Sequence, residues 1–261
     1  MRFNDPAFLA IFPWFAAIAG LCLGSFYSVC AHRYVTGGSI VRPGSHCPAC
    51  GHRLSPLELI PVVSWLVLRG RCRACKALVS VKYPLLELAS GLWAYLAALQ
   101  TGPSPAFVFL MAMGGIYITA SMIDLEIFIL PNRLTYSAAI LSLAGAAVLP
   151  GGDLMGALIG AAAGYLLFFA LAKAYLASKG VDGLGGGDVK LMLSIGALVG
   201  WRGLAFAILM GSLSALAVSP FFLRGAAKKN AIPIPFGPFL CFGAMTQALY
   251  GPHIQAFIRS L

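Results

Sequence analysis

The sequence predicts an all-α fold: a polytopic membrane protein with about eight transmembrane helices and a small cytoplasmic loop domain. Of the 261 residues, 60% are apolar and only 10% are charged, whereas a soluble domain of this length carries about 25% charged residues. The same apolar content excludes intrinsic disorder. Because about 20 apolar residues span a bilayer, the composition has room for close to eight such helices.

Eight apolar runs account for these helices. The first, Ala7–Val29, is long for the apolar part of a secretory signal, and no persuasive small-x-small cleavage site follows it, so we expect a retained span. The later runs are separated by turn residues rich in glycine and proline. They lie at about 84–100, 106–123, 134–150, 154–177, 189–201, 203–223 and 236–258.

The distribution of basic residues predicts the orientation of the spans. If they alternate with the N-terminus outside, the inner segments collect fifteen of the 18 Lys and Arg residues, and only Arg2, Arg202 and Arg259 stay outside. Lys and Arg in short loops resist translocation, so both termini are expected to be external. The net charge of +10 is thereby a topology signal, and we expect no nucleic-acid partner.

The chain is expected to have three parts: a first transmembrane helix at 1–30, a cytoplasmic loop domain at 31–83 and a helical core at 84–261. The loop domain carries two C-x2-C pairs with 21 residues between them, Cys47 with Cys50 and Cys72 with Cys75. This is the common spacing of a four-thiolate structural zinc site. A cytoplasmic location opposes disulfides, although a redox role remains the alternative. Four thiolates leave no vacancy for His46 or His52.

The remaining loop residues suggest no catalyst. The segment Leu57–Leu68 is too short to span a bilayer and is expected to lie along the inner interface. Glu58 and Glu87 are expected to be surface or interfacial charges. Three further cysteines lie in apolar runs and are expected to be small buried residues: Cys22, Cys30 and Cys241.

Two aspartates fall on the cytoplasmic side in this topology and can therefore meet. Asp124 ends the third apolar run, and Asp188 ends the glycine-rich run 183–188. From Asp188 to Trp201 there are 14 residues, a rise of about 20 Å at ~1.5 Å per residue, against a hydrocarbon core of about 30 Å. With Trp201 at the outer interface, Asp188 would lie below the inner one, where a carboxylate needs water or a partner.

Both aspartates also have structural interpretations. Asp188 could simply be the N-cap of the helix that follows it. Asp124 could be a hydrated loop acid, although the helix dipole disfavours an anion at a helix C-terminus. The neighbouring Glu126 and Asp182 are expected to be solvated loop charges, and Asp153 is expected to be a plain N-cap.

The glycines before Asp188 admit two interpretations as well. Gly185 and Gly187 could let the backbone approach a substrate strand closely and adopt positive φ, or the run could be a flexible linker. It is not a Walker A loop, because no Lys-Ser/Thr follows the glycines.

A close pair of carboxylates indicates acid–base chemistry. Two such groups a few ångströms apart cannot easily both ionise, so one keeps a proton. The ionised partner can then accept a proton from water, while the protonated partner donates to the carbonyl oxygen and helps the amine leave. Asp124 and Asp188 are therefore candidate catalysts of peptide-bond hydrolysis without a covalent intermediate.

Further motifs occur in a characteristic order along the chain. They are Gly24-Ser25-Phe26 with Arg33, the four cysteines, Ile60-Pro61 with Ser64-Trp65, Lys82-Tyr83-Pro84 with Glu87, Asp124 with Leu130-Pro131-Asn132, Gly185-x-Gly187-Asp188, and Ile234-Pro235-Phe236-Gly237-Pro238. From about residue 20 to residue 245, the chain resembles the bacterial type IV prepilin peptidases, which are Gly-x-Gly-Asp membrane aspartic proteases. Glu126 and Asn132 stand where that family often has aspartates.

The resemblance implies an enzyme of the bacterial inner membrane with Asp124 and Asp188 as catalytic residues near the cytoplasmic face and both termini periplasmic. Its implied substrates are type IV prepilins or pseudopilins of type II secretion, cut after a glycine that closes a short basic leader. Many members also N-methylate the new terminal residue with S-adenosylmethionine, so a bifunctional enzyme is expected. Neither the donor-binding residues nor the oligomeric state follows from the sequence.

Two other classes of protein remain open at this point. In a small-solute transporter, Asp124 and Asp188 would bind cations and the glycine run would mark a broken helix; the absence of an obvious internal repeat disfavours this. In a zinc-stabilised membrane scaffold without catalysis, the aspartates would merely cap helices.

Overall fold

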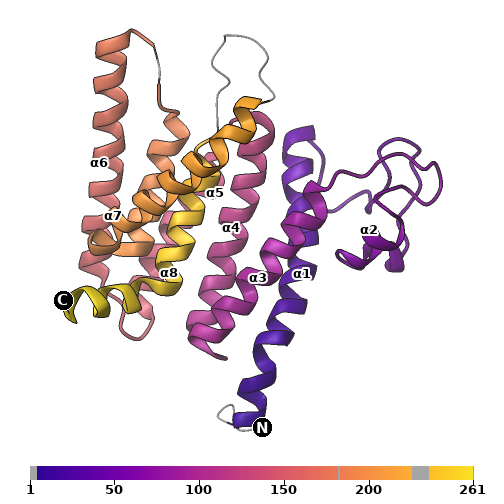
Figure 1. Ribbon diagram of the computed structural model, residues 1–261, viewed down its shortest axis with the longest axis horizontal. Helices are drawn as coiled ribbons and strands as arrows, with labels where there is room; N and C mark the ends of the chain where they lie inside the picture. Colours follow the sequence, from indigo (N-terminus) through magenta and orange to yellow (C-terminus); the bar gives the residue numbers. More distant parts are fainter. Residues whose placement is uncertain (1–4, 182, 225–234, 261) are drawn as a thin grey trace. The chain divides into compact units, whose positions relative to one another are not determined.

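A computed structural model of the chain, which describes residues 5–181, 183–224 and 235–260, confirms the all-α prediction. The chain forms two compact units, Met1–Met122 and Ile123–Leu261. In chain order (Figure 1), the elements are α1 (Pro6–Thr36), a 3-10 turn (Pro56–Leu59), α2 (Val63–Val67), α3 (Lys82–Thr101), α4 (Pro105–Ile127), α5 (Asn132–Val148), α6 (Leu154–Lys179), α7 (Gly186–Arg224) and α8 (Gly237–Ser260).

The prediction of eight spans is wrong for the part of the chain that the structure describes: it has eight α-helices, but only four are long and apolar enough to cross a membrane. These four are α1, α4, α6 and the Gly186–Pro220 part of α7. α2 has five residues. α5 has 17 residues, a rise of about 26 Å at ~1.5 Å per residue. The two predicted runs on either side of residue 202 lie in α7 as two helical segments that meet at a kink at Gly200, so the break predicted near residue 202 is present.

Local capping signals set the ends of the long helices. Asp5 accepts a hydrogen bond from the first turn of α1, and Gly37 ends that helix at φ 72°. Asp153 accepts from the amide of Gly156 at 2.8 Å, which confirms its prediction as the N-cap of α6. Gly180 closes α6 at φ 70°, a left-handed conformation that glycine adopts without steric cost.

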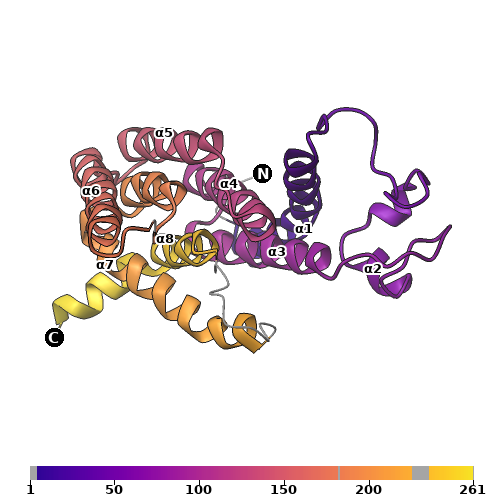
Figure 2. The same cartoon turned by 90° about the horizontal axis from the view of Figure 1, so that it is seen from above.

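In the first unit, α1 packs along α3, and the two lie side by side in both views (Figure 1; Figure 2). Gly20 and Gly24 make this possible. A Cβ on Gly20 would lie 2.5 Å from the Cβ of Ala94, and one on Gly24 would lie 2.8 Å from the Cα of Glu87. Glycines one turn apart let helix backbones approach closely, and here they bring α1 against the turn of α3 that carries Glu87.

In the second unit, α7 packs against α5, α6 and α8. Its contact with α6 is glycine-lined: a Cβ on Gly196 would lie 2.0 Å from the carbonyl oxygen of Gly160. At Gly200 the φ and ψ angles are 65° and 171°, so the helical path is interrupted there. This interruption leaves a short helical segment from Gly186 onwards, as expected from the short apolar run that begins at Asp188.

Candidate functional site

Asp124 is buried in the last turn of α4, with only 5% of its surface exposed. The turn ends because the amide of Phe128 bonds back to the carbonyl oxygen of Asp124 at 2.9 Å while Phe128 adopts φ 55°. The backbone amide of Gly237, at the start of α8, donates to the Asp124 carboxylate. Among the described residues, no donor reaches its Oδ2 atom. A buried carboxylate oxygen without a protein donor is free to hold a water molecule or a proton.

Asp188 is the third residue of α7, so the simple N-cap interpretation is wrong in detail. The helix begins at Gly186, and the amide of Asp188 already bonds to the carbonyl oxygen of Gly185 at 3.0 Å. The Asp188 carboxylate reaches back to the amide of Gly185, as an acidic residue in a first turn does in a capping box.

Both carboxylates belong to the second unit and are close enough to interact electrostatically. Leu130, from the loop between α4 and α5, packs against Gly187 and Gly237, the glycines beside the two aspartates. A Cβ on Gly187 would lie 3.0 Å from the Cβ of Leu130, and a Cβ on Gly237 would lie 3.0 Å from its Cδ1. The pair is therefore assembled from the end of α4 and the starts of α7 and α8.

The glycines before Asp188 contribute close packing rather than unusual backbone angles. None of Gly185, Gly186 and Gly187 has positive φ, so this part of the sequence interpretation is wrong. A Cβ on Gly185 would lie 3.2 Å from Oδ2 of Asp188. The missing side chains thus make room for the acid and for Leu130.

Gly237→Ala should slow a reaction that depends on Asp124 by about 10- to 100-fold, because the added methyl group would lie 2.7 Å from Oδ2 of Asp124 and displacing a reacting group by about 1 Å has effects of this size. Gly186→Ala is the matched control, since nothing lies within 4 Å of its Cβ position. Initial rates on a synthetic substrate measure both variants. Equal rates for both would show that the Gly237 contact does not position Asp124.

The neighbouring polar residues have other roles. Lys190, also in the first turns of α7, donates from Nζ to Oδ1 of Asn132 at 2.9 Å and so ties the start of α5 to α7. Sequence reasoning did not find this link, although a lysine on an apolar helix was a signal for it. Glu126 is half-buried in α4, and Asp182 lies outside the described residues.

In the first unit, the four predicted cysteine ligands converge. The Sγ atoms of Cys47, Cys50, Cys72 and Cys75 all lie within 4.8 Å of one another, and those of Cys47 and Cys75 are 3.8 Å apart. A tetrahedral site with zinc–sulfur bonds of about 2.3 Å requires sulfur separations of about 3.8 Å, whereas a disulfide requires about 2.05 Å. The cluster could therefore hold a metal ion.

Two similar turns present these thiols. In the first turn, the amide of Cys47 donates to the carbonyl oxygen of His52 at 2.9 Å. In the second, the amide of Cys72 donates to the carbonyl oxygen of Ala77 at 2.8 Å. The residue after each pair, Gly51 or Lys76, has positive φ. Each turn thus folds its two thiols toward the same point.

The turns also favour the thiolate form that binds metals. The amides of Ala49 and Cys50 donate to the Cys47 sulfur and lower the pKa of that thiol to about 7. The amide of Cys75 likewise lowers the pKa of the Cys72 thiol below its usual value. Backbone amides therefore favour the thiolate form of one cysteine in each pair, Cys47 in the first and Cys72 in the second.

The histidines beside the cysteines have other partners, as the four-thiolate interpretation requires. His46 Nδ1 lies 3.0 Å from the carbonyl oxygen of Gly44, and His52 Nε2 lies 3.3 Å from Oε1 of Glu58. The amide and hydroxyl of Ser55 donate to Glu58 and lower its carboxyl pKa to about 2. Glu58 is thus a fixed structural acid rather than the free surface charge expected from the sequence.

Glu87 and Cys22 also differ from expectation. Only 8% of the Glu87 surface is exposed, and its Oε2 accepts a hydrogen bond from the amide of Val62 at 2.7 Å. Glu87 is therefore a buried tie between α3 and the loop. Cys22 is exposed and Cys30 is half-buried, while Cys241 is buried as expected.

Apolar helices that bring two acidic side chains together on one site are what a membrane aspartic protease requires, and comparison with known proteins agrees with this class. Residues 18–101 match the family described as the bacterial peptidase A24 N-terminal domain. Residues 111–219 match the type IV leader peptidase family. The chain belongs to the type IV leader peptidase family, and its four long apolar helices indicate an integral membrane protein.

Individual relatives support the assignment over most of the chain. A prepilin leader peptidase/N-methyltransferase of Aeromonas salmonicida is 36% identical over 228 residues, covering 85% of this chain and 76% of that protein. Proteins of the same name from Burkholderia pseudomallei and Bacillus subtilis are each 34% identical, covering 91% and 92% of this chain and 85% and 95% of their own lengths. No solved structure matches.

Proposed function

We propose that this protein is a prepilin peptidase that removes the short basic leader from type IV prepilins or type II secretion pseudopilins and then N-methylates the new N-terminus. The observation that carries the proposal is the meeting of Asp124 and Asp188 in one unit, supported by close glycine packing. The names of the relatives supply the substrate class.

In this proposal the two aspartates share one proton, because adjacent carboxylates do not readily ionise together. The ionised acid accepts a proton from the attacking water, whose oxygen bonds to the scissile carbonyl carbon. The protonated acid donates to the carbonyl oxygen. Collapse of the tetrahedral species breaks the carbon–nitrogen bond, and the amine leaves with a proton from the pair. We assign Gly185 and Gly187 to the substrate-facing loop beside Asp188, where their missing side chains leave room for that acid and for Leu130.

We assign structural zinc to Cys47, Cys50, Cys72 and Cys75, since their sulfur separations suit tetrahedral coordination. The metal would hold the loop domain, which we place at 31–83 between the first helix at 1–30 and the core at 84–261. S-adenosylmethionine supplies an electrophilic methyl group for the second reaction. The freed amine must lose its proton before it can accept that group.

We place the protein in the bacterial inner membrane, with both termini periplasmic and the aspartates near the cytoplasmic face. In this orientation most of the basic residues lie in cytoplasmic segments, which agrees with the tendency of Lys and Arg to stay inside. A prepilin has a basic leader followed by an apolar helix. A site at the inner interface holds the helix in lipid and the leader in water, so that depth in the bilayer selects the bond to be cut.

The purified full chain in detergent tests the proposal directly. A synthetic peptide with a basic leader, a glycine and an apolar segment should be cut after the glycine, and mass spectrometry should show a further gain of one methyl group when S-adenosylmethionine is present. A peptide that stays intact would refute the peptidase assignment. Cleavage without methylation would refute only the second activity.

A further inference from the structure

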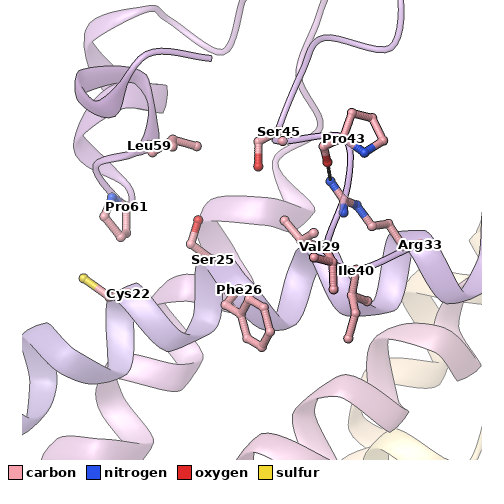
Figure 3. A pocket seen from close by; sticks show the side chains of 12 residues that line it. Cys22, Ser25, Phe26, Val29, Arg33, Ile40, Pro43, Ser45, Leu59 and Pro61 are labelled. Carbon is pink, nitrogen blue, oxygen red and sulfur yellow. Dashed lines mark hydrogen bonds between the residues drawn. The ribbon is translucent and has the colours of Figure 1, made fainter. Parts of the chain in front are cut away.

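A cavity of about 300 Å³ lies between α1 and the cysteine-bearing loop, within the first unit. This volume falls at the lower end of the range for small-molecule sites. Cys22, Ser25, Phe26, Val29 and Arg33 line it from α1, and Leu59 and Pro61 face them from the loop (Figure 3). The residues that line the cavity all belong to the first unit, whereas Asp124 and Asp188 belong to the second.

Arg33 provides the positive charge of the cavity. Its guanidinium donates to the carbonyl oxygens of Ser39 and Pro43, and Figure 3 shows the second of these bonds. No carboxylate in the described part of the chain forms an ion pair with it. The charge is thus positioned by neutral acceptors and is not neutralised, which is the arrangement that favours binding of an anionic group.

The rest of the cavity combines apolar walls with hydroxyl groups. The side chains of Phe26, Val29 and Ile40 form an apolar surface, and the hydroxyls of Ser25 and Ser45 face the cavity from opposite walls (Figure 3). Such a lining suits a ligand that combines an apolar part with hydrogen-bonding groups and an anionic group.

One wall of the cavity is held in a strained conformation by Glu87. Val62, directly after Pro61, has φ 62°, which is unfavourable for a β-branched residue. The buried Glu87 accepts its amide at 2.7 Å, and the backbone of Glu87 lies against Gly24, beside Ser25. Strain of this kind persists only where surrounding contacts impose it, and it clusters at ligand sites.

We propose that this cavity binds S-adenosylmethionine, with Arg33 contacting the donor's carboxylate, the apolar wall contacting adenine and Glu87 positioning the Pro61–Val62 wall. The inference rests on the proposed function. Of the two activities in the relatives' names, the aspartate pair accounts for cleavage, and this cavity offers a site for the other. In the methyl transfer, the neutral terminal amine bonds to the methyl carbon, the carbon–sulfur bond breaks, and the sulfonium becomes a thioether.

Calorimetric titration of the purified full chain with S-adenosylhomocysteine, the product of that reaction, tests the site without requiring turnover. Ser25→Leu should fill the cavity and weaken binding at least 10-fold. Ala19→Leu is the matched control, because Ala19 is an exposed small residue on the same helix outside the cavity. Equal affinities for the two variants would overturn the proposal.

Arg33→Met separates direct contact from damage to the loop. It should weaken binding of S-adenosylhomocysteine about 10-fold or more while leaving that of adenosine, which has no carboxylate, within about two-fold. An equal loss for both ligands would overturn the role given to Arg33.

Leader cleavage by the same preparations keeps this inference separate from the proposed function. Wild-type and Ser25→Leu protein should both cut the leader peptide. Cleavage by a wild-type protein that binds no S-adenosylhomocysteine would overturn the cavity assignment alone, whereas absence of cleavage would count against the peptidase. Native mass spectrometry also tests for a lipid site. If wild-type protein carries bound phosphatidylglycerol and Ser25→Leu loses it, the cavity is a lipid site and the S-adenosylmethionine assignment is overturned.

Discussion

Asp124→Asn and Asp188→Asn should each lower the rate of leader cleavage by about 10²–10⁴-fold, the range typical for loss of a general acid or base. An amide can neither accept the proton of water nor return it to the leaving amine. Both side chains keep their size, so the helical fold should be retained. Initial rates measured by mass spectrometry, together with circular dichroism and thermal melting in detergent, check both statements.

Asp153→Asn is the matched control for this pair. Asp153 caps α6 through the amide of Gly156, and asparagine is an equally good N-cap, so this variant should cleave at the wild-type rate. Full turnover by either Asp124→Asn or Asp188→Asn would refute the catalytic pair. It would favour the transporter or scaffold interpretation of the same residues.

Cys47→Ser and Cys72→Ser should each abolish binding of the one zinc ion expected per chain and unfold the loop around it. In small metal-stabilised domains the metal contributes about 10–16 kcal/mol, which is also their folding free energy. Elemental analysis measures the zinc, and limited proteolysis followed by mass spectrometry should locate new cuts between residues 40 and 80. Methylation should be lost to a greater extent than cleavage, because the aspartates belong to the other unit.

Cys30→Ser is the matched control, since Cys30 lies on α1 away from the cluster. It should retain both the zinc and the resistance to protease. Wild-type protein without metal would contradict the zinc assignment. A variant lacking all four thiols that methylates at the full rate would contradict the dependence of methylation on the loop.

The sequence predicted which side chains come together better than it predicted the spans. The cysteine spacing predicted a cluster that the structure assembles. The predicted topology put Asp124 and Asp188 on the same side, and the structure brings the two carboxylates close enough to interact. The number of spans depends instead on where each helix ends. Gly200 breaks α7 into two helical segments, as the turn predicted near residue 202 requires, whereas α5, with 17 residues, is short for a span.

Contacts between distant segments could not be predicted in the same way. The amide of Gly237 donates to Asp124, and Glu87 holds the strained Val62, but neither pair has a local spacing that reveals it. Glu87 looked like a surface charge because its partner is a backbone amide 25 residues away. Almost every residue has a backbone amide, whatever its side chain. A sequence pattern therefore cannot show which amide donates to a given acid.

The bond from Gly237 to Asp124 also defines how much of the chain a working catalytic unit needs. Residues 111–219, which match the peptidase family, contain both acids, yet the amide that secures one of them belongs to α8. A fragment cut to the family boundaries would therefore keep the reactive groups and lose part of their support. Under the proposed function, we therefore expect the minimal protease to extend into the last helix.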